Sequence, residues 1–151
     1  MIFERTTTIH ATLAEVFDFF SQPDNLARIT PPAVGFRVLR APARPLREGD
    51  VLEYRLRAAG VPLRWRSRIT LWQPGRAFAD LQERGPFAYW LHTHTFREEA
   101  GGVTMHDHVD YRLPFGFLGR LVAGALVRRT IAKSFDYRAE ALRQHFVTHS
   151  R

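Results

Sequence analysis

The spacing of apolar residues changes its period once along this chain, close to Pro114, and this change constrains the fold strongly. From Phe36 to about Leu113, apolar and polar residues alternate in short segments, which is typical of strands with two opposite faces. From Leu118 to about Val147, apolar residues recur at helical spacing. These residues are Leu118, Leu121, Val122, Ala125, Leu126, Ala132, Phe135, Leu142 and Phe146.

A helix of about 30 residues would be about 45 Å long, so it needs an extended sheet to lie across. The segment "MIFERTTTI" before the alternating region predicts a first strand, and Thr12 with Glu15 has the spacing of a capping box. That helix should end at Pro23, where a second short helix would begin and continue to Ile29. We therefore predict one α+β domain over residues 1–151. In this domain an antiparallel sheet built from hairpins packs against the long C-terminal helix in two layers.

Composition narrows the class of protein. The chain has no cysteine, no apolar run long enough to cross a bilayer, and charged residues where a signal peptide would be apolar, so we expect a cytoplasmic protein without stable membrane insertion. Its net charge is +7, but the arginines are spread along the chain rather than clustered. Nucleic-acid binding is therefore not expected. An interaction protein that uses its basic surface is kept as a second alternative.

The segment at residues 63–72 separates two sets of side chains most clearly. Leu63, Trp65, Ser67, Ile69 and Leu71 fall on one face. Arg64, Arg66 and Arg68 fall on the other. We interpret the arginine row as a solvated outer face rather than a phosphate-binding stripe, so the first set should face the core.

The segment "WLHTHTF" at residues 90–96 places two histidines inside an aromatic stripe. Its partner strand follows the turn near Gly101, and the register decides which side chains meet. A turn centred between Ala100 and Gly101 pairs Phe96 with Met105, His94 with Asp107, His92 with Val109 and Trp90 with Tyr111. A turn one residue longer would pair His94 with His108 and His92 with Asp110. We favour the first register because it keeps every apolar residue of both stripes on one face.

That register buries Asp107 opposite His94, and a buried carboxylate is costly unless it is paired. One interpretation is a His–Asp pair that satisfies itself in the core. Another is a polar spot, formed by His92, His94 and Asp107, in the wall of an apolar cavity. A metal site with His92, His94 and Asp107 is the weakest interpretation, because His-x-His alone is unspecific, so we expect no metal and no cofactor.

Asp80 and Gln82 share a face with Phe78 and are weaker candidates. A turn that places Asp80 opposite Trp90 and Gln82 opposite Ala88 would bring both to the inner wall. The chain has no nucleophile elbow and no glycine-rich phosphate loop, so we assign no catalytic residue, with His94 and Asp107 as weak candidates.

The order of these segments, with the words "GPFAYWLHTHTF" and "GGVTMHDHVDYRLPFGFLG", resembles the helix-grip superfamily, also called START-like or SRPBCC. The resemblance is to its bacterial ligand-binding branch, which is related to polyketide cyclases/dehydrases, and it covers almost the whole chain. It implies a helix-grip fold, in which a curved antiparallel sheet of about six to seven strands wraps around the long C-terminal helix, with a deep, largely apolar cavity between them.

Carried onto this sequence, the resemblance implies a set of cavity residues. The wall would consist of Tyr54, Trp65, Trp90, His92, His94, Asp107, Tyr111 and Phe135, with Leu121, Ala125 and Leu142 as further helix positions. Each aromatic residue could instead be ordinary core. The implied function is binding of a small hydrophobic molecule such as a lipid, a quinone, a polyketide-like or an aromatic compound. The alternative is a cyclase/dehydratase in which Asp107 orients His94 as general base. A homodimer is left open.

Overall fold

The computed structural model describes residues 1–58 and 60–149, and side chains in the last helix as far as Val147. One antiparallel sheet of seven strands holds the chain together, in the order β1-β7-β6-β5-β4-β3-β2. The strands are β1 (Ile2–Ile9), β2 (Arg37–Arg40), β3 (Val51–Ala58), β4 (Val61–Gln73), β5 (Ala77–Arg84), β6 (Tyr89–Glu99) and β7 (Gly102–Arg112). The helices are α1 (Leu13–Ser21), η1 (Pro23–Ala27), η2 (Pro32–Val34) and α2 (Gly116–His149). The predicted α+β helix-grip fold is confirmed.

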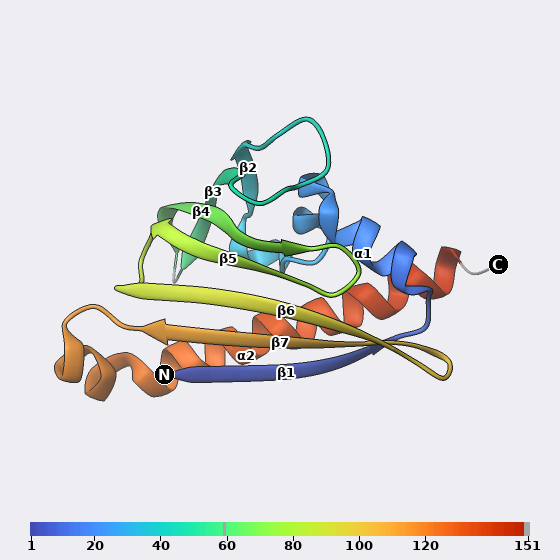
Figure 1. The fold of residues 1–151 in the computed structure, drawn as a ribbon. Coiled ribbons are helices and arrows are strands. Elements are labelled where there is room, and N and C mark those ends of the chain that lie inside the picture. Colours follow the sequence, from blue (N-terminus) through green and yellow to red (C-terminus); the bar gives the residue numbers. More distant parts are fainter. Residues whose placement is uncertain (59, 150–151) are drawn as a thin grey trace.

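The arrangement in space follows from the connections. Strands β2 to β7 form a meander of neighbours, and β1 joins the free edge of β7. Helix α2 runs along the sheet beside β6, β7 and β1, and its last turns lie near α1 (Figure 1). Thr12 caps α1 as the sequence predicts, because its hydroxyl accepts from the Glu15 amide while the Glu15 carboxylate accepts from the Thr12 amide.

The core has three apolar clusters, of which the smallest consists of Leu46, Leu52 and Ile69, and the other two lie between the sheet and the long helix. One surrounds α1 and the last turns of α2, and it includes Phe17, Phe96, Met105 and Leu142. The other lies toward the opposite end of α2 and includes the residues Phe3, Trp65, Trp90, Val109, Tyr111 and Phe135. Along β6 and β7, the polar residues His92, His94 and Asp107 stand between these two clusters. The sheet therefore carries a polar layer across its buried face.

The hairpin that joins β6 to β7 has the predicted register. Trp90 pairs with Tyr111, His92 with Val109, His94 with Asp107 and Phe96 with Met105. Glu99 pairs with Gly102, so the turn consists of Ala100 and Gly101 alone, and Gly101 has a φ of +92° that favours glycine. The longer turn, with His94 opposite His108, does not form.

The first half of α2 departs from the prediction that its apolar stripe faces the sheet. Leu121 is 71% exposed, and Leu118, Val122, Ala125 and Leu126 are also exposed. Ala123 and Val127 are partly buried against the core, and buried large side chains at helical spacing begin at Ile131 and continue through Phe135, Leu142 and Phe146. At 34 residues, α2 is about 51 Å long, whereas the 11-residue strands β6 and β7 span about 36 Å. Its first turns therefore extend past the core.

The middle strands agree with the predicted faces except at one position. Arg64 is exposed on the outer face, and Arg66 and Arg68 there bind Glu83. A bulge between Ile69 and Leu71 shifts the alternation, so Trp72 rather than Leu71 packs against Phe17 and Phe78.

Among the described residues, no helix has both the length and the apolar character needed to cross a bilayer.

Candidate functional site

Six polar side chains gather on the inner face of the sheet beneath α2. This polar cluster consists of Ser67 of β4, Asp80 of β5, His92 and His94 of β6, Asp107 of β7 and Arg138 of α2. Strand alternation explains the strand members, because each occupies an inward position and the strands are hydrogen-bonded neighbours. The site is built by four strands that are consecutive in the sequence.

Asp107 is the centre of the cluster. Its Oδ1 lies 2.9 Å from His92 Nε2, in a hydrogen bond, and 2.8 Å from His94 Nδ1. The contact to His94 is short but poorly aligned, so His94 Nδ1 lacks a well-formed hydrogen bond. Arg138 approaches from the helix, with Nη1 3.9 Å from the same oxygen and the guanidinium 4.8 Å from the Phe135 ring centroid.

A second set of contacts extends the cluster toward β3 and β4. Ser67 Oγ accepts a hydrogen bond from Trp65 Nε1 at 3.0 Å and donates one to Asp80 Oδ2 at 3.1 Å. The other oxygen of Asp80, Oδ1, faces His92 Nδ1 at 3.8 Å. His92 therefore stands between two carboxylates, one at each ring nitrogen.

Burial determines the charges in the cluster. It lowers the pKa of His92 to about 4, with His94 acting in the same direction, and it also lowers the pKa of His94. Burial by itself would raise the pKa of Asp107, but the contacts from His92 and His94 outweigh it and hold this pKa below its ordinary value. Burial raises the pKa of Asp80, although His92 and Ser67 oppose that shift. Near neutral pH the two imidazoles are uncharged and Asp107 is ionised.

These charges fix the tautomers. An ionised carboxylate can only accept hydrogen bonds, so His92 must carry its proton on Nε2 and His94 must carry its proton on Nδ1. His92 Nδ1 and His94 Nε2 are then the two nitrogens with a free lone pair. The cluster thus offers two neutral acceptors beside a fixed negative charge.

Several buried polar atoms of this region have no hydrogen-bond partner among the described residues. They are His94 Nδ1, Asp107 Oδ2, Arg138 Nε and the hydroxyl of Tyr111. Buried polar atoms are usually paired, and each one left unpaired costs about 1–3 kcal/mol. The cluster is therefore not a self-satisfied ion pair.

The aromatic residues predicted for the wall lie together beside the polar cluster. Trp65 stacks on Tyr54 and meets Trp90 edge to face, with ring centroids 5.9 Å and 5.4 Å apart. Tyr111 contacts Trp90, and Phe135 of α2 packs against His92 at 5.3 Å. Of this set Tyr54 is only partly buried, as is Phe87, which the sequence does not single out. These two rings mark the accessible edge of the aromatic cluster.

Some of the weaker candidates need correction. Asp80 pairs with His92 rather than with Trp90, which still leaves it on the inner face. Gln82 is not part of the polar cluster, because its side-chain amide bonds both the amide and the carbonyl of Phe87 and so braces the turn before β6. Leu121 and Ala125 are exposed and only Leu142 is buried, in the core around α1.

The sequence places Ser67 on the inner face without singling it out as a site residue, and it misses Arg138 entirely. Arg138 lies three residues after Phe135 on the same face of α2, and that spacing is the one signal that could have indicated it. An arginine in a helix is ordinarily placed in solvent, and the prediction of the apolar stripe therefore passes over it.

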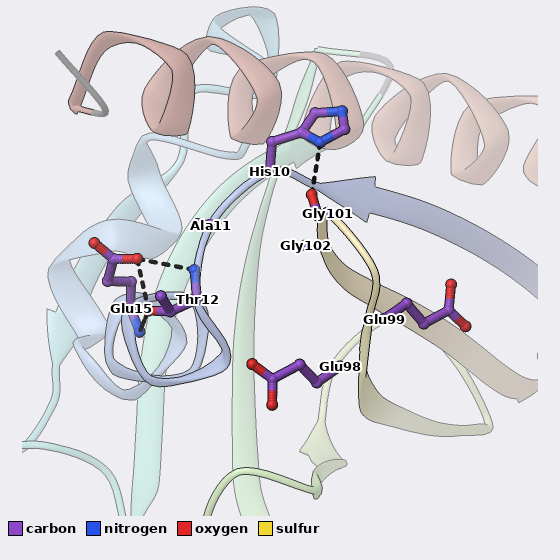
Figure 2. Close-up of a pocket in the computed structure, with 8 residues that line it drawn as sticks. All are labelled: His10, Ala11, Thr12, Glu15, Glu98, Glu99, Gly101 and Gly102. Atoms are coloured by element: carbon purple, nitrogen blue, oxygen red, sulfur yellow. Dashed lines mark hydrogen bonds between the residues drawn. The ribbon is translucent and has the colours of Figure 1, made fainter.

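Two hollows on the surface lie away from this site. Figure 2 shows the first, where the link from β1 to α1 meets the β6–β7 hairpin and His10 Nδ1 donates to the carbonyl of Gly101. Its lining includes the carboxylates of Glu15, Glu98 and Glu99. The second hollow runs between α1 and Trp72 of β4. Neither is lined by residues of the polar cluster.

Among the residues that the structure describes, two groups of three hold potential metal ligands within 4.8 Å of one another. One is Asp80, His92 and His94, inside the polar cluster. The other is Glu4, His106 and His108 on the outer face, where His108 Nδ1 lies 3.0 Å from Glu4 Oε1.

Comparison with known structures supports the same fold. The chain is 20% identical to the Zhui aromatase/cyclase from Streptomyces sp. R1128, with a TM-score of 0.76 over 100% of this chain and 96% of that one. A protein of Thermus thermophilus is 18% identical, with a TM-score of 0.78 over the full length of both chains. The di-domain ARO/CYC StfQ from the steffimycin biosynthetic pathway is 13% identical, with a TM-score of 0.77 over 99% of this chain and 51% of that one.

A search of curated protein sequences finds no match. The family model described as "Polyketide cyclase / dehydrase and lipid transport" matches residues 1–147, which is nearly the whole chain. With the sheet wrapped on α2 and the polar cluster beneath it, this match assigns the chain to the polyketide cyclase/dehydrase and lipid transport family.

Proposed function

We propose that this protein binds a small, mainly apolar molecule between the sheet and α2, and that the polar cluster holds the polar end of that molecule. The observation that carries the proposal is the set of buried, unpaired polar atoms at Asp107, His94 and Arg138. A ligand that bonds these atoms removes a cost that the protein alone bears.

The chemistry of these atoms indicates the polar end of the ligand. Asp107 Oδ2 is an acceptor and Arg138 Nε is a donor, and their side chains approach within 3.9 Å. A hydroxyl group both donates and accepts, so it can satisfy the two together. The preferred ligand is therefore a phenol, an enol or an alcohol on an apolar body.

The aromatic cluster suits the remainder of such a ligand. Trp65, Trp90 and Phe135 border the polar cluster, and the partly buried Tyr54 and Phe87 provide the side from which a ligand would enter. Each 100 Å² of apolar surface that a ligand buries there would contribute about 2.5 kcal/mol. Entry requires the aromatic side chains to move, because they pack on one another.

The proposal is tested by thermal shift and native mass spectrometry with matched compounds that differ in one hydroxyl, such as naphthols against naphthalene and hydroxyanthraquinones against anthraquinone. We expect the hydroxyl compounds to raise the melting temperature of the wild-type protein. Asp107→Asn should lose most of this shift, whereas Asp110→Asn, on the outer face of the same strand, should keep it. The proposal is wrong if no compound binds, or if the hydroxyl and Asp107 make no difference.

A cyclase/dehydratase is the second candidate. The observation that favours it is the 2.8 Å contact between His94 Nδ1 and Asp107 Oδ1, because a carboxylate at one imidazole nitrogen orients the other nitrogen, Nε2, as a general base. With a hydroxylated polyketide-like compound that binds, we expect His94→Gln to keep binding and to lose turnover. A protein that binds such compounds and leaves them unchanged would be a carrier rather than an enzyme.

A further inference from the structure

A second kind of ligand fits the polar cluster on its opposite side. We infer that Asp80, His92 and His94 form a binding site for a divalent transition-metal ion of the zinc type. The site uses one carboxylate oxygen and two imidazole nitrogens, which lie within 4.8 Å of one another on the adjacent strands β5 and β6. The sequence suggests Asp107 as the third ligand, whereas the structure gives that place to Asp80.

The role of Asp107 in this site is to orient the two histidines. Its Oδ1 lies 2.9 Å from His92 Nε2 and 2.8 Å from His94 Nδ1, which are the nitrogens that carry the proton in the two rings. Histidines that bind a metal commonly donate their other N–H to a carboxylate in this way, which fixes the tautomer and the ring orientation. One buried aspartate therefore prepares both imidazoles and leaves His92 Nδ1 and His94 Nε2 to bind an ion.

Asp80, the third ligand, is also held in place by a hydrogen bond. Asp80 Oδ2 accepts the hydrogen bond of Ser67, so its other oxygen, Oδ1, remains on the side of His92 Nδ1 at 3.8 Å. Zinc bonds nitrogen and oxygen at about 2.0–2.2 Å, and tetrahedral ligand atoms then lie about 3.3 Å apart. Closing the site requires shifts of about 1 Å, which Asp80 can make because its side chain is 19% exposed.

Charge also favours a cation here. With Asp80 deprotonated, as a metal ligand must be, Asp80 and Asp107 supply two negative charges, and Arg138 supplies one positive charge near Asp107. A divalent ion brings the total to one positive charge, which one anionic fourth ligand such as hydroxide or an enolate would neutralise. Two imidazoles and one carboxylate match borderline ions such as Zn²⁺ and Co²⁺ rather than Ca²⁺ or Mg²⁺, which prefer oxygen ligands.

The test measures Zn²⁺ binding by calorimetry and Co²⁺ binding by visible absorption, on tag-free, chelator-treated protein without any organic ligand. We expect one tight Zn²⁺ site and an intense Co²⁺ absorption band, as a four- or five-coordinate ion gives. Asp80→Asn, which can keep the Ser67 contact, should lower the affinity for Zn²⁺ at least about tenfold. Ca²⁺ should not compete.

The exposed group Glu4, His106 and His108 provides the matched control, since it could also bind added metal. Glu4→Gln and His108→Gln should leave the tight site and the Co²⁺ band unchanged. The inference is overturned if the wild-type protein binds no Zn²⁺, if Asp80→Asn binds as the wild type does, or if the outer-face variants remove the tight site. His94→Gln is measured alongside, so a poorly folded Asp80→Asn protein does not prevent a decision. Because no organic compound is present, failure here leaves the proposed ligand-binding function untouched.

Discussion

His92 and Asp107 are not paired across β6 and β7, yet their side chains form the hydrogen bond at the centre of the polar cluster. Asp107 pairs with His94, and His92 pairs with Val109, one inward position further along β7. The bond of 2.9 Å from His92 Nε2 to Asp107 Oδ1 therefore runs diagonally, while the His94 contact is direct. A single carboxylate thus holds two consecutive inward residues of the neighbouring strand.

Replacing Asp107 by Asn tests this bridge. The amide has nearly the same shape and can keep an oxygen in the place of Oδ1, but it carries no negative charge, so both imidazole N–H groups lose an ionised acceptor. We expect the free energy of unfolding to fall by about 1–3 kcal/mol, measured by urea denaturation. Asp110→Asn on the same strand, where the side chain is 47% exposed, should change it by less than about 0.5 kcal/mol. Equal effects of the two changes would show that the bridge contributes no stability.

The depressed pKa of His92 predicts acid sensitivity. Burial lowers this pKa from 6.5 to about 4, so between these values the unfolded chain binds a proton that the folded protein does not. Stability should therefore fall as the pH falls from about 6.5 to 4, by up to about 3 kcal/mol from this residue. The lowered pKa of Asp107 acts in the same direction at lower pH, whereas the raised pKa of Asp80 acts in the opposite direction.

The measurement for this prediction is the unfolding free energy as a function of pH in two destabilised variants. His92→Gln should have a shallower slope between pH 6.5 and 4 than the wild type. Phe135→Leu removes packing beside His92 and keeps the imidazole, so it should keep the wild-type slope at a lower overall stability. Identical slopes in wild type and His92→Gln would refute the assignment.

The two halves of α2 should respond differently to one and the same substitution. Leu142 is fully buried among the residues around α1, and Leu142→Ala should cost about 3 kcal/mol through lost burial and a cavity. Leu121 is 71% exposed, and Leu121→Ala should change stability by about 0.5 kcal/mol or less. Thermal and urea unfolding measure both. A large loss for Leu121→Ala would mean that Leu121 packs against the protein rather than lying in solvent.

Ser67 connects the aromatic cluster to the polar cluster through two hydrogen bonds, and removing its hydroxyl should lower the stability of the protein. Ser67→Ala leaves buried Trp65 Nε1 without an acceptor and Asp80 Oδ2 without a donor, so we expect a loss of about 1–3 kcal/mol in urea denaturation. Ser21→Ala is the matched control, because Ser21 is similarly buried but makes one bond, to the carbonyl of Asp18. A loss no greater than that of Ser21→Ala would argue against the link.

Alternation and turn chemistry were sufficient to predict most of the local structure. The Ala100–Gly101 turn and the shared apolar stripe favour the pairing of His94 with Asp107, because the register one residue longer would place Trp90 and Phe96 beside His106, Asp110 and Arg112. For the same reason, the burial of His92 and Asp107 could be predicted from these two segments alone. The segments on either side of the turn before β6 have no matching apolar stripes that would set their register, and the predicted pairing of Asp80 with Trp90 was wrong.

The tertiary structure decided how far the long helix extends past the sheet, and which of its side chains reach the polar cluster. Helical periodicity shows which residues share a face, but it does not show where the sheet ends, so Leu121 was predicted inward and lies in solvent. Arg138 reaches Asp107, and Ser67 reaches Asp80, only because four strands and a helix meet there. The sequence by itself determined the strand register and the polar pair across β6 and β7, since both follow from local period. Only the folded chain determined the complete cluster and its unpaired atoms, because these depend on contacts between segments far apart in the sequence.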